Sequence, residues 1–142
     1  MPYDNRNVRD LGAHYEVNYS RAKRHVASET LVNMFLREAN RNPSARTQFG
    51  AILSGCAKVF SRRFIEELLR GVPVGEGGSI IGGEMEGVGL LSLSERDDPI
   101  WAVVKGICDF GDGRCNIADT RNEACARSAA FVLAAIANAA LT

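Results

Sequence analysis

The sequence contains few residues that would hold a metal ion or cross-link the chain. It has two histidines and four cysteines in 142 residues. No two cysteines are spaced as Cys-x-x-Cys, and His14 and His25 lie far from every cysteine in sequence. Structural zinc sites use paired thiols or imidazoles, so we expect no metal site. The N-terminus also has no apolar signal-peptide core, and together these features predict a reduced, cytoplasmic protein.

Net charge and a membrane-length apolar run are also missing. Lysine plus arginine and aspartate plus glutamate number 17 each, so the net charge is zero. Without a net charge there is no overall field to attract nucleic acid or an anionic membrane, and we expect neither partner. The apolar stretch Ala124–Leu141 is interrupted by Arg127, Ser128 and Asn138 and is shorter than the roughly 20 apolar residues of a membrane span. It predicts a buried helix.

A glycine-rich stretch, residues 71–83, lacks the features of a phosphate-binding loop. It contains no Gly-Lys-Ser or Gly-Lys-Thr, and it precedes an expected strand instead of following one. We interpret it as a flexible connection.

Hydrophobic patterning predicts helices alternating with strands. The expected elements are a helix from Ser28 to Asn42, a strand Phe49–Leu53, a helix from Ser61 to Leu69, a strand Ile80–Glu84, a helix Val88–Ser94, a strand Ile100–Cys108, and a helix from Asp119 or Thr120 to Leu141. Residues 1–20 show no sustained periodicity and are expected to be a loop. The hydroxyls of Ser28 and Ser61 are expected to cap their helices. This order predicts an α/β domain whose largely parallel sheet contains the three strands.

Carboxylates follow two of the expected strands. Glu84 and Glu86 are two residues apart, so on a strand they would share one face, with Met85 on the other. Asp109 ends the next strand. A right-handed crossover would place the two strands side by side and parallel. We therefore expect Glu86 and Asp109 to lie together at the carboxyl edge of the sheet, where open parallel sheets bind ligands.

The motifs GEMEG at residues 83–87 and VVKGICDFGDG at residues 103–113 resemble the purine nucleoside phosphorylase and nucleosidase superfamily. Its members carry Met-Glu after one strand and Ile-Ser-Asp, or a similar sequence, after the next. A third motif, Gly50–Val59, is similar to the family's strand ending in Ser-Gly-Asp, with Cys56 in place of the aspartate. The resemblance covers roughly Arg46 to the C-terminus.

The resemblance implies a fold and a division of the chain. The fold would be a three-layer αβα phosphorylase-like arrangement with a mostly parallel or mixed central sheet that lacks its N-terminal strands. Residues 1–45 would be a lead-in and a helix. Residues 46–142 would be the C-terminal part of a nucleoside phosphorylase-like domain.

The implied activity is cleavage of the N-glycosidic bond of a purine nucleoside, with phosphate or water as co-substrate and no cofactor. Cleavage places positive charge on the sugar and negative charge on the departing base. Asp109 would be the general acid at purine N7, and the Glu86 carboxylate would accept from the ribose hydroxyls. The implied substrate-binding residues are Glu84, Met85, Glu86, Val59 and Cys108, the last at a position where serine is common in the family.

Structural interpretations stand beside these roles. An aspartate after a strand is usually a turn or capping residue, Glu84 can interact with the dipole of a following helix, and methionines such as Met85 are more often core residues. The family's N-terminal acid and phosphate-binding arginines have no counterpart before Arg46. An alternative function is therefore a non-catalytic nucleoside-binding or assembly module, a truncated relative of the family. We expect a homo-oligomer or part of a larger chain, inactive when isolated.

Overall fold

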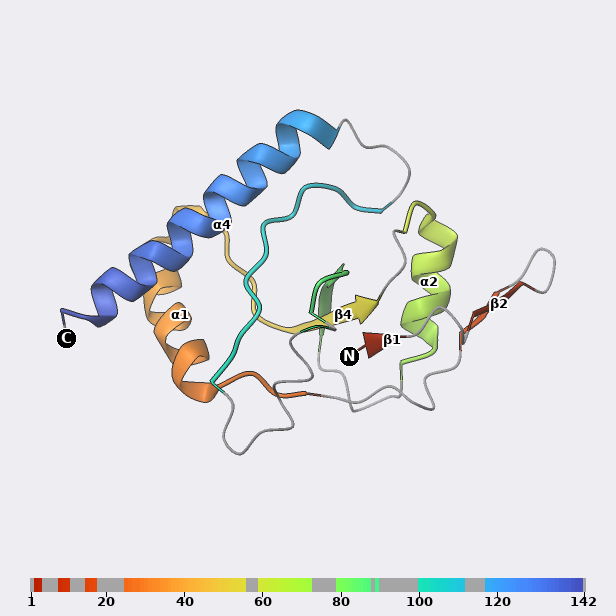
Figure 1. The fold of residues 1–142 in the computed structure, drawn as a ribbon, viewed down its shortest axis with the longest axis horizontal. Helices are drawn as coiled ribbons and strands as arrows, with labels where there is room; N and C mark the ends of the chain where they lie inside the picture. The colour runs from red at the N-terminus through yellow and green to blue at the C-terminus, as the bar shows by residue number, and fades with distance from the viewer. Residues whose placement is uncertain are drawn as a thin grey trace. The chain divides into compact units, whose positions relative to one another are not determined.

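The computed structural model describes residues 2–3, 8–10, 15–17, 25–55, 59–72, 79–87, 89, 100–111 and 117–141. These residues form a mixed α/β structure (Figure 1). The chain divides into two compact units. One contains residues 1–25, 49–96 and 111–113, and the other contains residues 26–48, 97–110 and 114–142. Both units combine segments that are distant in sequence.

The first unit contains a parallel sheet in the order β1–β4–β5. Its strands are β1 (Pro2–Tyr3), β4 (Ala51–Gly55) and β5 (Ile80–Glu84). β4 pairs in parallel with both neighbours, and Ser54 is the register partner of both Pro2 and Glu84. The parallel pairing of β4 with β5 agrees with the expected largely parallel sheet, although β4 begins two residues later than expected.

Strands within the first 17 residues show that the prediction of a loop for this segment was wrong. β1 adds a strand to the sheet beside β4, so the sheet does not begin at residue 49 as expected. β2 (Val8–Asp10) and β3 (Tyr15–Val17) pair antiparallel, with Val8 opposite Val17. These strands contain two or three residues, which is too short for an alternating pattern to be seen in the sequence.

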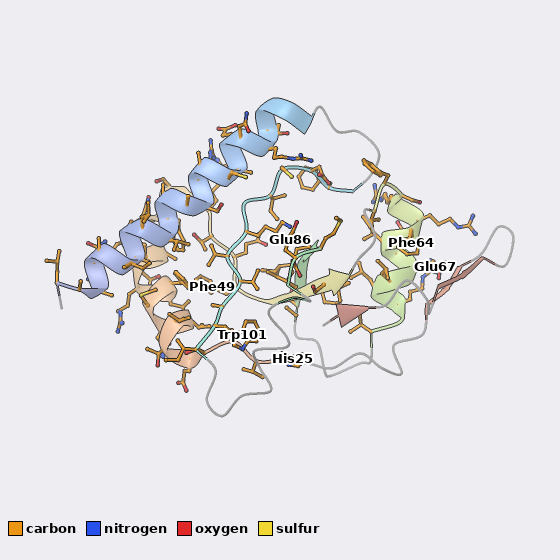
Figure 2. All side chains as sticks on the ribbon, viewed as in Figure 1. His25, Phe49, Phe64, Glu67, Glu86 and Trp101 are labelled. Atoms are coloured by element: carbon orange, nitrogen blue, oxygen red, sulfur yellow. The ribbon has the colours of Figure 1, made fainter. Side chains whose placement is uncertain are left out.

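Helix α2 (Arg62–Arg70) follows β4 and belongs to the same unit. Its N-terminus is capped as predicted, because the Ser61 hydroxyl accepts from the backbone N–H of Phe64 at 3.3 Å. The helix ends at Gly71, also as predicted. Leu68 is buried and forms the core of the unit with Leu53. Figure 2 shows Phe64 and Glu67 on this helix.

The second unit contains two helices, α1 (Glu29–Arg41) and α4 (Ile117–Ala139), and the short 3-10 helix η2 (Pro43–Ala45). α1 and α4 lie side by side (Figure 1). The rings of Phe35 and Phe131 are 5.9 Å apart and join the two helices. α1 ends before Pro43, as predicted. None of the described helices is both long and apolar enough to cross a membrane.

The N-termini of these two helices differ from the predictions. Ser28 is the N-cap residue of α1, but its hydroxyl makes no capping hydrogen bond. Its backbone N–H donates to the carbonyl of Trp101 at 2.8 Å. α4 already begins at Ile117, so Asp119 and Thr120 lie inside the helix and not at its cap. The predicted helix Val88–Ser94 lies outside the described residues except for Gly89.

The prediction of a strand over Ile100–Cys108 was wrong. This segment belongs to the second unit and is neither strand nor helix. A strand forms only where a neighbouring strand completes its hydrogen-bond ladder. An apolar run in the sequence predicts that the segment is buried, but it does not specify which element the segment packs against. The segment instead packs against α4, where a Cβ at Gly106 would come within 2.6 Å of the Ala124 carbonyl carbon.

A buried carboxylate also joins α1 to α4. Glu38 is only 5% exposed, and its carboxylate accepts from the Asn138 side-chain amide at 2.7 Å. Removing the donor leaves a charged acceptor buried without this partner, which is costly.

We therefore expect Asn138→Ala to lower the free energy of unfolding by about 1.5 kcal/mol. Urea unfolding followed by circular dichroism would measure the loss. Asn122→Ala is the matched control, because Asn122 is exposed on the same helix. Equal stability of the two variants would contradict a stabilising role for the Glu38–Asn138 bond.

Candidate functional site

The carboxyl ends of β4 and β5 form the candidate site in the first unit. The two strands are parallel, and Leu53–Gly83 and Ser54–Glu84 are their last paired positions. Parallel strands bring their carboxyl ends to the same edge of a sheet, where ligands bind in open α/β structures. At this edge the structure brings together Ser54 from β4 and the GEMEG motif at the end of β5.

Glu84 is the last residue of β5 and is only 8% exposed. One carboxylate oxygen, Oε2, accepts from the backbone N–H groups of Glu86 and Gly87, both at 2.6 Å. Charge-assisted hydrogen bonds of this kind are stronger than neutral ones. Glu84 therefore holds the backbone of the turn that follows the strand.

Glu86 lies outside β5, in the turn, and its side chain is exposed. The expectation that Glu84 and Glu86 share one face of a strand was therefore wrong, because the strand ends at the first of them. Glu86 Oε2 accepts from the Met85 backbone N–H at 3.2 Å. Met85 is itself 43% exposed. The turn thus presents a carboxylate and a thioether at the surface, with Glu86 labelled in Figure 2.

Ser54 is a polar residue of this site that the sequence analysis missed. It is 6% exposed, and its hydroxyl has no hydrogen-bond partner among the described residues. Ser54 stands at the serine of the Ser-Gly-Asp motif that Gly50–Val59 resembles, but no role was assigned to it from the sequence. Pairing the GAILSG strand with the GEMEG strand in parallel would have pointed to it, because Ser54 is the register partner of Glu84.

Val59, which the resemblance implies to be a substrate-binding residue, lies in the hydrophobic core and not in the turn after β5. It is half-buried and packs against the Leu53–Leu68 core of the first unit. Its side chain is therefore part of that core. The neighbouring Cys56 and Lys58 lie outside the described residues.

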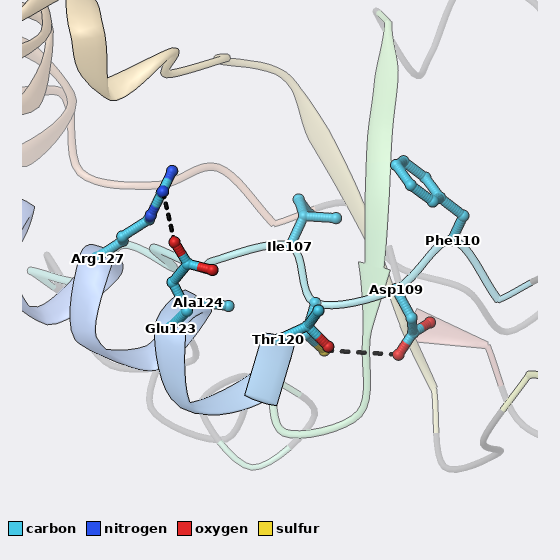
Figure 3. Close-up of a pocket in the computed structure, with 8 residues that line it drawn as sticks. Ile107, Asp109, Phe110, Thr120, Glu123, Ala124 and Arg127 are labelled. Atoms are coloured by element: carbon cyan, nitrogen blue, oxygen red, sulfur yellow. Dashed lines mark hydrogen bonds and ion pairs between the residues drawn. The ribbon is translucent and has the colours of Figure 1, made fainter. Parts of the chain in front are cut away.

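Asp109 and Cys108 belong to the second unit, where they line a pocket with a volume of ≈ 270 Å³ (Figure 3). Both residues are half-buried. The Cys108 thiol donates to Asp109 Oδ2 at 3.5 Å, a distance within the range for a weak sulfur donor. The remaining lining residues are Ile107, Phe110, Thr120, Glu123, Ala124 and Arg127.

One wall of this pocket is a face of α4. Thr120, Glu123, Ala124 and Arg127 recur at helical spacing, which places them on one side of the helix. The sequence analysis missed them as site residues, although this periodicity could have identified the face. Arg127 and Glu123 form an ion pair at 2.5 Å (Figure 3). Both side chains are mostly exposed, so the pair contributes little to stability.

The pocket therefore combines opposite charges with apolar surface. Two carboxyl groups and one guanidinium group line the same cavity as Ile107 and Ala124. Among the described residues no group of three or more metal-binding side chains gathers at one point.

The carboxylates predicted to lie together fall in different units. Glu84 and Glu86 belong to the first unit, and Asp109 belongs to the second. Proximity of Glu86 and Asp109 stays a prediction.

Comparison with known proteins found no match to the chain among protein-family models, curated proteins or solved structures. The resemblance to nucleoside phosphorylases therefore depends on the sequence motifs.

Proposed function

We propose that the protein cleaves the N-glycosidic bond of purine nucleosides, by hydrolysis or phosphorolysis, and that this chain supplies groups that bind the ribose and the base. In this proposal the chain has a phosphorylase-like αβα fold and acts in the cytoplasm. The observation that carries the proposal is the GEMEG turn at the carboxyl ends of two parallel strands, with Glu84 holding the backbone and Glu86 exposed.

Glu86 is the ribose-binding residue in this proposal. A carboxylate can accept from two vicinal hydroxyls at once, which orients the sugar and favours the positive charge that develops on it. Two bonds from Glu84 to the backbone restrain the turn on which Glu86 lies. A restrained carboxylate loses less conformational entropy when the ribose binds. Met85, exposed beside it, contacts the apolar face of the sugar.

Asp109 donates a proton to N7 of the departing base. Protonation removes the negative charge that would otherwise build up on the purine, which makes the base a better leaving group. The pocket at Asp109 contains the mixed polar and apolar lining that a purine ring needs. The Cys108 thiol donates to Asp109 Oδ2, which leaves Oδ1 of the protonated Asp109 to carry the proton that is transferred to N7.

Nucleoside binding by the chain tests this proposal. We expect isothermal titration calorimetry to detect adenosine or inosine binding, and Glu86→Gln to weaken it by about 10- to 100-fold, the cost of losing hydrogen bonds to a charged group. Glu66→Gln is the control, because Glu66 is exposed on α2 and the change removes the same charge. No binding to the unaltered chain, or equal weakening by both substitutions, would overturn the proposal.

A further inference from the structure

The Ser54 hydroxyl is a buried polar group whose role the proposed mechanism leaves unexplained. Its oxygen has no hydrogen-bond partner among the described residues, and the residue is only 6% exposed. Buried hydroxyls are normally paired, because leaving one unpaired forfeits its interaction with water. The position of this unpaired hydroxyl opposite the buried Glu84 carboxylate therefore suggests an interaction between the two groups.

The geometry around Gly87 brings this hydroxyl close to Glu84. A Cβ at Gly87 would lie 3.1 Å from Ser54 Oγ and in contact with Glu84 Oε1. The two oxygens therefore approach the same backbone position from adjacent strands. The N–H groups of Glu86 and Gly87 donate to Oε2, and Oε1 is the Glu84 oxygen nearest to the position of a Gly87 Cβ.

We propose that Ser54 is a positioning residue: its hydroxyl turns to donate to Glu84 Oε1 and thereby holds the turn that presents Glu86 to the ribose. A serine side chain has three staggered rotamers, so the hydroxyl can turn without moving β4. With Oε1 bound to Ser54, the carboxylate cannot rotate away from the amides of Glu86 and Gly87. This inference rests on the proposed nucleoside function for the identity of the ligand.

Gly87 is part of the same arrangement. Any side chain at this position would occupy the space that Ser54 Oγ and Glu84 Oε1 approach. The absence of a Cβ lets the turn lie close against both oxygens, so the turn can be short and restrained. Close packing, and not a positive φ angle, therefore explains why a glycine occupies position 87.

The ribose preference tests the positioning role. Glu86 contacts both vicinal hydroxyls only if its turn is held, so we expect Ser54→Ala to reduce the preference for a ribonucleoside over the matching 2′-deoxyribonucleoside by about tenfold. Ser54→Thr keeps a hydroxyl and should restore most of the preference. Ser44→Ala is the matched control, because Ser44 is exposed and its hydroxyl bonds to Asn42 in the second unit.

Hydrogen exchange provides a readout that does not need a nucleoside. We expect Ser54→Ala to speed exchange of the Glu86 and Gly87 amides by about tenfold, since both depend on a fixed Glu84 carboxylate. Unchanged exchange would overturn the inference, as would faster exchange with an unchanged ribose preference, because the role would then be structural only. Failure of the proposed function can be distinguished from failure of this inference, because the unaltered chain would then bind no nucleoside.

Discussion

Under the proposed nucleoside function, Asp109→Asn is expected to lower the rate of base release from purine nucleosides by about 10²–10⁴-fold. Nucleoside binding should change far less, because a general acid acts mainly in the transition state. Asparagine keeps the size of the side chain but cannot transfer a proton to N7. Steady-state kinetics of base release, combined with calorimetric binding, would separate the two effects.

Activated substrates provide the control for this prediction. A 7-methylpurine nucleoside already carries the positive charge that protonation at N7 would supply, so its cleavage should lose little in the Asp109→Asn variant. Unchanged turnover of unactivated nucleosides would remove Asp109 from the mechanism. Nucleoside binding without any base release from the unaltered protein would favour the alternative function, a non-catalytic binding module.

Gly106→Ala should cause the largest loss of stability among the substitutions considered. A Cβ at Gly106 would contact the Ala124 carbonyl oxygen, and it would lie 2.6 Å from the carbonyl carbon and 2.9 Å from Cα. These are backbone atoms of α4, which cannot rotate away as the end of a side chain can. We expect the free energy of unfolding to fall by about 3 kcal/mol, the upper end of the usual range for overpacking.

Trp101 is a local probe for this loss. It is the single tryptophan of the chain and belongs to the second unit, as do Gly106 and α4. Urea unfolding followed by its fluorescence should show a lower midpoint for Gly106→Ala. Gly83→Ala is the control, because a Cβ there would meet only the Leu53 carbonyl at an ordinary 3.6 Å. Equal midpoints for the two variants would contradict the close packing of Gly106 on α4.

Elements that depend on neighbours in sequence were predicted well. The end of α1 before Pro43, the cap of α2 at Ser61 and the bounds of β5 agree with the structure. In each case the cause is local, because a proline cannot continue a helix and a serine hydroxyl reaches an N–H three residues away. The site motif at the end of β5 was found for the same reason, since its residues are contiguous.

Elements that depend on a distant partner were not predicted. The apolar run Ile100–Cys108 has the composition of a buried strand, yet it packs on α4. β1 is too short to be seen without β4 beside it. Ser28 shows the same limit, because its backbone N–H donates to Trp101, a residue remote in sequence, while the expected side-chain cap is not formed.

The sequence alone determined the two carboxylate motifs and the boundaries of locally specified elements, and it predicted a largely parallel sheet. Only the tertiary structure decided that Glu84 is buried while Glu86 is exposed, and that Ser54 faces the same turn. It also decided that a face of α4 completes the pocket at Asp109. The physical reason is that residue type and spacing specify local hydrogen bonds and the tendency to be buried. Which side chains share a site depends on packing between segments that are remote in the chain.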